Sequence, residues 1–198
     1  MAATRRDGKA RISAHDRLLG AAAVLFYRDG IAGTGIDAIV KQAGVAKKSL
    51  YNNFSSKAEL VAAYLQARHE EWLALYAARL QQARGPAART LAVFDAYVDH
   101  AEFAYERGFR GCGQWNAAAE LPVEDASRQA IRAYKEEVEA LLARHLTEHL
   151  SGDAERAAPL ARHLAFLLEG AVARAGLEGG SQCLHQARQM AASLLEQW

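Results

Sequence analysis

Seven residues near the N-terminus, 47–53, carry an unusual concentration of hydrogen-bond donors. The segment reads KKSLYNN, with two lysines, a serine, a tyrosine and two asparagines around the single apolar residue Leu50. Lysine can donate to guanine O6 and N7, and asparagine can pair with adenine through two hydrogen bonds. A helix of this composition is therefore expected to face a nucleic acid. The alternative is that Lys47 and Lys48 form an ordinary solvated helix face.

Two predicted helices precede this segment and must position it. Ser13 is placed to cap the first helix, whose apolar stripe should end at Gly30. Thr34 repeats the cap signal for a second helix of about eight residues, and Gly44 supplies the left-handed turn that follows it. The pattern therefore predicts three short helices, of which the second and third meet at a glycine.

Six more helices are predicted in the rest of the chain, and no strand. Ser56 and Glu59 form a capping box for a long fourth helix. The seventh helix should span 123–150, and the eighth should begin within 155–158, because Pro159 would be costly beyond the first turn. Since no alternating β-branched run occurs between the turn signals, the fold class is all-α, with about nine helices.

The composition excludes several classes of protein. The chain has 198 residues, of which 51% are hydrophobic, but its longest apolar stretch, 18–27, is far shorter than the roughly 20 residues that cross a bilayer. No signal-peptide apolar region is present. Cys112 and Cys183 lie far apart in the sequence, so free thiols in a reducing compartment are expected. We expect a cytoplasmic protein with no membrane partner.

The charge of the chain is unevenly distributed. Residues 1–60 carry ten Lys or Arg against five acids, whereas the remainder carries 14 basic and 18 acidic residues. A polyanion is the natural partner of the basic N-terminal part alone. Its first basic residues are Arg5, Arg6, Lys9 and Arg11. They could form an arm that enters a minor groove or a disordered basic tail.

Residues 18–65 resemble the N-terminal head of the TetR (tetracycline-repressor-like) family of transcriptional regulators. The matching elements, in family order and spacing, are Leu25-Phe26, Gly30, Thr34, Ile39, Ala43-Gly44-Val45, Leu50-Tyr51, Phe54, Lys57 and Leu60. The segment GCGQWNAAAEL, residues 111–121, is similar to the sixth helix of some members. The resemblance implies a helix-turn-helix DNA-binding domain over 1–55 and a helical effector-binding and dimerisation domain over 56–198.

The resemblance also implies which residues of the head contact double-stranded DNA. Positions that hold phosphates match Thr34, Tyr51 and Lys57, and positions turned toward base edges or phosphates match Lys47, Lys48, Ser49 and Asn52. Two residues depart from the family pattern. Val40 stands where a small residue is usual, and Ala46 stands where Ser or Thr would cap the recognition helix. Loss of that cap should weaken the helix by about 1 kcal/mol.

The middle helices of the family enclose a pocket for an effector. Residues of this chain that fall there are His100, Phe103, Cys112, Trp115, Asn116, Glu120, Tyr134, Phe166 and Glu169. A mainly aromatic wall with a few polar groups suits a small organic molecule. The alternative is that most of these side chains are ordinary core or surface residues. Cys112 could sense electrophiles with help from Arg110, or serve as a small buried apolar side chain.

The last two helices carry an apolar stripe that two terminal helices should not be able to hide on one monomer. Its members are Leu160, Leu164, Leu168, Leu184, Ala187, Leu194 and Leu195. An exposed stripe of this kind marks a partner surface. A homodimer, in which these helices build a four-helix interface, is what the family resemblance implies.

No cofactor, metal or enzymatic activity is expected. His145 and His149 have the spacing of a metal pair, but no third ligand has a plausible spacing, so solvated histidines on a polar face are expected. No nucleophile elbow, phosphate-binding loop or dinucleotide fingerprint occurs. The leading function is a repressor released from a palindromic operator by a small organic effector. The alternatives are a DNA-binding regulator without an effector and a helical-bundle enzyme.

Overall fold

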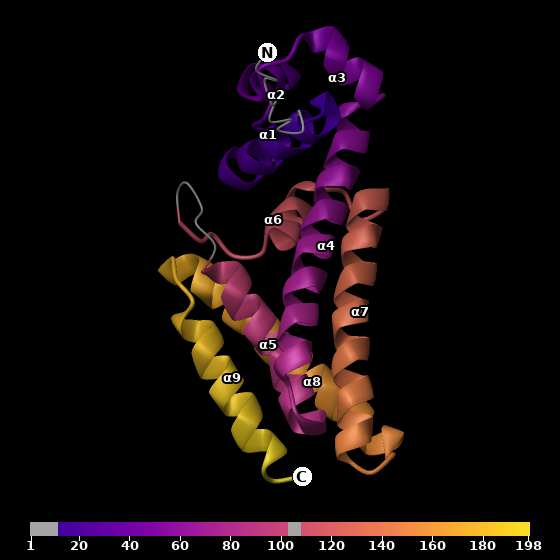
Figure 1. The fold of residues 1–198 in the computed structure, drawn as a ribbon, viewed down its shortest axis with the longest axis vertical. Coiled ribbons are helices and arrows are strands. Elements are labelled where there is room, and N and C mark those ends of the chain that lie inside the picture. The colour runs from indigo at the N-terminus through magenta and orange to yellow at the C-terminus, as the bar shows by residue number, and fades with distance from the viewer. Residues whose placement is uncertain (1–11, 103–107) are drawn as a thin grey trace, which may run out of the picture. The chain divides into compact units, whose positions relative to one another are not determined.

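The protein is all-α over the residues described by its computed structural model, 12–102 and 108–198 (Figure 1). Nine helices lie in these ranges. They are α1 (Ala14–Asp29), α2 (Ile36–Ala43), α3 (Lys47–Asn53), α4 (Lys57–Gln82), α5 (Gly85–Ala101), α6 (Gly113–Glu120), α7 (Ala126–His149), α8 (Ala154–Glu178) and α9 (Gln182–Leu195). This confirms the fold class. Within the described ranges, no helix has the length and apolar character needed to span a bilayer.

The first compact unit ends at Ala63 and contains α1, α2, α3 and the start of α4. We call this unit the head. Its core is made by the apolar faces of the four helices, through Leu18, Leu25, Phe26, Ile39, Leu50, Phe54 and Leu60. The sequence predicts a domain boundary after residue 55. The compact unit also includes the start of α4, where Leu60 is fully buried.

Local signals in the sequence account for the helix ends of the head. The hydroxyl of Ser13 accepts a hydrogen bond from the Asp16 amide at 3.0 Å, which starts α1 as predicted. Gly44 adopts φ 61°, the left-handed conformation that ends α2. Ser56 Oγ accepts from the Glu59 amide at 3.1 Å, but the Glu59 carboxylate turns to the amide and hydroxyl of Ser55. The predicted contact of Ser56 with the Glu59 amide is therefore confirmed, whereas the Glu59 carboxylate binds Ser55 instead of the Ser56 amide.

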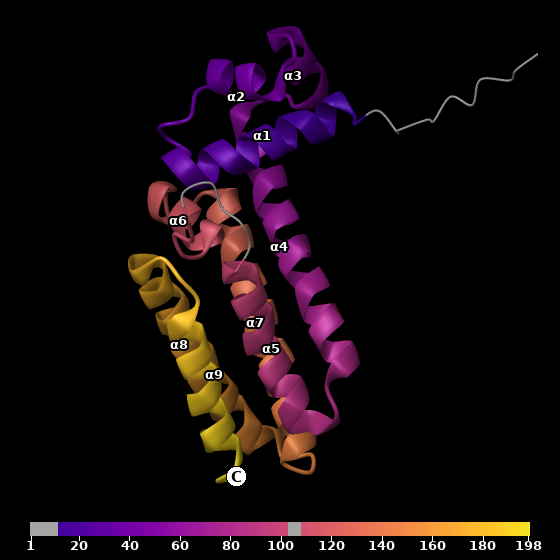
Figure 2. The same ribbon diagram turned by 60° about the vertical axis from the view of Figure 1, so that its left-hand side comes forward.

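The second unit runs from Tyr64 to Trp198 and is called the body here. Figure 2 shows α8 and α9 side by side, and α8 also packs against α7 while α9 packs against α5. The largest side chains of the shared core are Trp72, Tyr76, Phe94, Tyr97, Leu142, Leu146, Leu164 and Leu168. These contacts bury the facing sides of four of the five long helices.

Two predicted helix starts in the body are wrong. α7 begins at Ala126 because the Asp125 carboxylate accepts from the Ser127 amide at 2.8 Å. α8 begins at Ala154 because the Asp153 carboxylate accepts from the Arg156 amide at 3.0 Å. Pro159 consequently lies in the second turn of α8, beyond the position at which proline is free of cost. The cap, rather than the proline, sets the start of this helix.

The apolar stripe of α8 and α9 is not exposed, so that prediction is also wrong. Leu160, Leu164, Leu168, Leu184, Ala187 and Leu195 are each at most 5% exposed, and Leu194 is partly buried against the same core. α5 and α7 cover the two helices within one chain. The large exposed apolar side chains of α8 and α9 are instead Phe166, Leu177 and Met190.

The paired histidines of α7 are not solvated either. His145 is 3% exposed, and its Nε2 lies 2.6 Å from the hydroxyl of Tyr76. Burial lowers the pKa of His145. His149 is half-buried, with Nε2 3.1 Å from the carbonyl oxygen of Leu195. No group of three metal-ligating side chains occurs within 12–102 and 108–198.

Candidate DNA-binding surface and ligand cavity

The third helix turns its leucine inward and its hydrogen-bond donors outward. Leu50 is fully buried in the head, and Ser49 is half-buried. The exposed side chains are those of Lys47, Lys48, Tyr51 and Asn52. Their spacing places them on one face of the helix. This face combines two charged donors with a phenol and an amide, which is the chemistry needed to hold phosphates and read base edges.

The start of α3 carries no side-chain cap. Ala46 occupies the N-cap position with extended backbone angles and makes no capping hydrogen bond. The absence of a side-chain cap at this helix start is thus confirmed, and the loss of about 1 kcal/mol of helix stability stays a prediction. Val40, the second departure, is buried at the contact of the head helices.

Among the residues of α3 that were predicted to bind DNA, Lys47 has a charged partner. Its Nζ lies 2.8 Å from Oδ1 of Asp37 on α2. The hydrogen bond to Asp37 raises the pKa of Lys47, so its ammonium remains charged. Both side chains are more than half exposed, which leaves the pair open to solvent and to a competing phosphate.

Two residues assigned to phosphates by resemblance have other contacts. Thr34 is 2% exposed, and its hydroxyl donates to the carbonyl oxygens of Gly30 at 2.6 Å and Leu25 at 3.3 Å. It neither caps α2, whose N-cap is Gly35, nor presents a free donor to a phosphate. Lys57 Nζ donates to the Ile31 carbonyl oxygen at 2.5 Å. The side chains of Thr34 and Lys57 therefore stabilise the end of α1 and the segment that connects it to α2.

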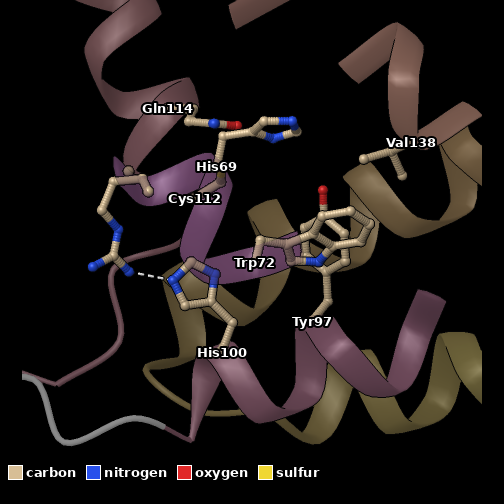
Figure 3. Close-up of a pocket in the computed structure, with 9 residues that line it drawn as sticks. His69, Trp72, Tyr97, His100, Cys112, Gln114 and Val138 are labelled. Carbon is tan, nitrogen blue, oxygen red and sulfur yellow. Dashed lines mark hydrogen bonds between the residues drawn. The ribbon is translucent and has the colours of Figure 1, made fainter. Parts of the chain in front are cut away.

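The body contains a small cavity, called the inner cavity, which is lined by side chains from four helices. Figure 3 shows the labelled members His69, Trp72, Tyr97, His100, Cys112, Gln114 and Val138, and Arg68 and Gly113 complete the lining. Its volume of about 20 Å³ is enough for one water-sized molecule. Of the predicted effector residues that the structure describes, His100 and Cys112 line it.

His100 is held neutral by its surroundings. Burial, and then the positive charges of Arg68 and Lys135, lower the pKa of His100 to about 3. The Arg68 guanidinium donates to Nε2 of His100, which requires that nitrogen to be an acceptor. Arg68 also pairs with Glu71 at 2.7 Å. The cavity wall therefore combines a neutral imidazole with a paired guanidinium.

Lys135 is the charged centre of this region, and the sequence prediction missed it. Its Nζ lies 3.0 Å from Oε1 of Glu169, 3.2 Å from the hydroxyl of Tyr97 and 3.6 Å from Sγ of Cys112. Burial alone would lower the pKa of Lys135, but the negative partners outweigh burial and hold its pKa well above the ordinary value. Glu169 forms the ion pair with Lys135, whereas burial raises the pKa of the Tyr97 phenol. Lys135 therefore remains an ammonium.

A larger opening, called the outer pocket, lies between α6, α7 and α8. It has a volume of about 450 Å³, and its apolar walls are Trp115, Ala118, Ile131, Ala165 and Phe166. Lys135 and Glu169 also line it, and Trp115 Nε1 donates to Oε2 of Glu169. Since Lys135 contacts Cys112 and Tyr97 of the inner cavity as well, the Lys135–Glu169 pair lies where the two spaces approach each other.

The remaining predicted effector residues are dispersed. Tyr134 donates to Gln66 at 2.5 Å and stacks on His69 behind the cavity wall. Asn116 donates to the Arg110 carbonyl oxygen at 3.1 Å, and Glu120 is exposed at the end of α6. Phe103 lies outside the described residues, as does the basic segment 5–11.

A sequence signal for Lys135 did exist. Ile131, Lys135, Val138 and Leu142 follow one another at intervals of four, three and four residues, so Lys135 occupies the buried stripe of α7. A lysine in an apolar stripe requires a buried counter-ion, because an isolated charge is costly in the interior. The prediction instead emphasised its aromatic neighbour Tyr134.

Comparisons with known proteins agree with this architecture. Residues 18–64 match the family model described as bacterial regulatory proteins, tetR family. A TetR-family transcriptional regulator from Streptomyces coelicolor is 29% identical, with a TM-score of 0.84 over 93% of this chain and 95% of that one. A TetR transcriptional regulator from Streptomyces avermitilis is 30% identical, with a TM-score of 0.70 over 93% and 99%. One from Chloroflexus aurantiacus is 26% identical, with a TM-score of 0.77 over 93% and 94%. The comparison with curated proteins gave no match.

Proposed function

Because this chain belongs to the TetR family of bacterial regulatory proteins, we propose that it is a repressor that a small organic effector releases from a pseudo-palindromic operator. It is a DNA-binding transcriptional regulator. The observation that carries the DNA-binding role is the exposed donor face of α3 around the buried Leu50. We further propose that the protein represses transcription, that the effector releases it from DNA, and that it acts in the cytoplasm.

On the proposed operator, α3 enters the major groove. Lys47 and Lys48 supply charge to phosphates or guanine edges, and Asn52 pairs with an adenine. Tyr51 holds a phosphate through its hydroxyl. Thr34 and Lys57 act indirectly in this proposal, because their polar atoms are already bonded to the backbone of residues 25–31.

We propose that two copies bind one operator through an interface built from α8 and α9. A groove of about 570 Å³ runs between these helices, and its apolar walls include Phe166, Leu167, Ala171 and Met190. Phe166 and Met190 are 69% and 56% exposed in a single chain. Large exposed apolar side chains on adjacent helices favour an isologous partner, which would bury the same surface on both copies.

The outer pocket is the proposed effector site. Its apolar walls suit the carbon skeleton of an organic molecule. Its charged lining residues are Lys135 and Glu169, which pair with each other, and Arg128, Arg132, Glu136 and Glu139. An effector that engages Lys135 or Glu169 competes with the ion pair that joins α7 to α8. It would release DNA only if it bound more tightly to the conformer that does not fit the operator.

A regulator without an effector is the second candidate, and the tight inner cavity favours it. With about 20 Å³ free there, a ligand larger than water would have to remain in the outer pocket or displace side chains. Thermal-shift screening of small molecules, followed by an operator-release assay, separates the two. A ligand at 100 times its Kd stabilises the protein by about 2.7 kcal/mol. By reciprocity, operator DNA must lower the affinity of the protein for that ligand by the same factor by which the ligand lowers its affinity for the operator.

A further inference from the structure

The two cysteines of this protein have opposite electrostatic surroundings. Cys112 Sγ lies 3.6 Å from the ammonium of Lys135. Cys183 donates its S–H to Oε2 of Glu178 at 3.2 Å, and this carboxylate raises the pKa of the Cys183 thiol. Positive charge beside sulfur favours its reaction as a nucleophile, whereas a neighbouring carboxylate opposes it. The structure therefore provides a reactive candidate and a cysteine for comparison, which lines the groove of the proposed dimer interface.

Cys112 lines the inner cavity together with Trp72, a residue that carries an unused hydrogen-bond donor. Trp72, which lines the same inner cavity, is 4% exposed, and its Nε1 has no hydrogen-bond partner among the described residues. A buried indole N–H without an acceptor is unfavourable, and most buried donors have a partner. Trp72 Nε1 could therefore take an acceptor only from an oxygen-containing molecule that comes within hydrogen-bond distance of the indole.

We propose that Cys112 is a site of reversible oxidation by a peroxide, with Lys135 as the residue that assists the attacking sulfur. The size of the inner cavity selects the reagent, because about 20 Å³ admits a molecule near the size of water and excludes bulky electrophiles. Hydrogen peroxide is small enough and accepts hydrogen bonds. Cys112 is half-buried and lines the cavity, so its side chain borders the space that the peroxide would occupy.

The reaction balances without any further reagent. Sγ attacks one peroxide oxygen, the S–O bond forms and the O–O bond breaks. The departing hydroxide takes a proton from the Lys135 ammonium and becomes water, and the proton of the thiol restores the ammonium. The sulfur is oxidised by two electrons to a sulfenic acid, and the peroxide is reduced. The Nζ–H groups stabilise the negative charge that develops during the transfer.

Oxidation would change the environment of Lys135. The sulfenic oxygen is a stronger acceptor than a thiol sulfur, so it competes with Glu169 for the ammonium. Because Glu169 lies on α8 and Lys135 on α7, oxidation would weaken the link between these helices. Any effect on operator binding rests on the proposed function, whereas the chemistry at Cys112 does not.

Differential alkylation tests the proposal directly on the full chain. The native protein is exposed to hydrogen peroxide, the reaction is stopped with catalase, and the remaining thiols are alkylated after unfolding and quantified by mass spectrometry. We expect Cys112 to be lost at least tenfold faster than Cys183 and to be recovered with dithiothreitol. Rates within twofold of each other, or a loss that dithiothreitol does not reverse, would overturn the proposal.

Variants at position 135 test the assisting role. Lys135→Met should slow the oxidation of Cys112 at least tenfold and leave Cys183 unchanged, and Lys135→Arg should restore most of the rate. Circular dichroism verifies that each variant is folded. If a variant is unfolded, the ratio of the Cys112 and Cys183 oxidation rates in the wild-type protein still decides the proposal. A Cys112 rate that is equal in all three folded proteins would refute the role of Lys135. Because DNA is absent from this assay, its failure would leave the DNA-binding proposal intact.

Discussion

Lys47 and Asp37 form an ion pair across the surface of the head, with 2.8 Å between Nζ and Oδ1. The pair joins the helix that carries the donor face to the helix before it. It also places a carboxylate beside the lysine that would meet a phosphate. In the absence of DNA, the Asp37 carboxylate therefore partly neutralises the Lys47 ammonium. A DNA phosphate must compete with Asp37 for the interaction with Lys47.

Asp37→Asn should increase affinity for non-specific duplex DNA by roughly two- to fivefold at low salt, the range of an exposed ion pair. The gain should shrink as salt screens the charges. Fluorescence anisotropy with a random-sequence duplex measures it. In a Lys47→Met background the substitution should have a much smaller effect. An equal gain with and without Lys47 would contradict coupling through this pair.

Two residues on the donor face should behave differently when truncated. Lys48→Ala should weaken binding to all sequences alike and lower the salt slope by about one unit, as expected for loss of one phosphate contact. Asn52→Ala should relax preference at one base position per half-site by about 1–3 kcal/mol. Binding profiles over a panel of single-base operator variants measure both effects. An unchanged profile for Asn52→Ala would exclude base reading by that residue.

The sequence predicted those elements whose signals are local. Ser13 and Gly44 act through neighbouring backbone, so the helices of the head could be placed from the sequence. Pro159 shows the limit, because the Asp153 cap overrides the local cost of a proline. Whether an apolar side chain is exposed depends on distant helices. Leu164 is buried in the core that α8 shares with α7 and α9, which no pattern within α8 alone could reveal.

The same distinction applies to the candidate sites. The exposure of Lys48 and Asn52 follows from helical periodicity around Leu50, which a short sequence window contains. The Lys135–Glu169 pair joins residues that are 34 positions apart, and the sequence names no partner for either. Only the packing of α7 against α8 in the folded body reveals that Lys135 pairs with Glu169.

The stability of the protein should decrease in mild acid because of His100. In the folded protein its pKa is about 3, whereas the unfolded chain binds a proton near the ordinary value of 6.5. Below pH 6.5 the unfolded state therefore binds the additional proton, and stability falls until about pH 3. The loss from this group should reach about 2 kcal/mol at pH 5.

Urea unfolding at pH 7 and pH 5 measures this loss, with His100→Asn as the control. Asparagine retains an acceptor for Arg68 but does not titrate, so the variant should lose about 2 kcal/mol less than the wild type between the two pH values. Identical pH dependence of the two proteins would show that His100 is not held neutral in the folded state.

The proposed dimer predicts a position-specific effect on α9. Met190→Glu would place a charge within the apolar groove and should raise the dimer dissociation constant by at least about tenfold. Gln189→Glu adds the same charge at the neighbouring exposed residue, outside the groove lining, and should have a much smaller effect. Sedimentation velocity over a concentration series measures both. A stable Met190→Glu dimer would place the interface elsewhere.

The most direct test of the central claim is selection of bound duplexes from a random DNA pool by the full-length wild-type protein. Two recognition helices in a two-fold dimer should enrich an inverted repeat, with half-site centres about 10–10.5 base pairs apart or somewhat more. Asn52→Ala should lose information at one position in each half of that repeat. A pool that enriches no motif, or only a single unrepeated half-site, would contradict the account of this protein as a dimeric operator-binding regulator.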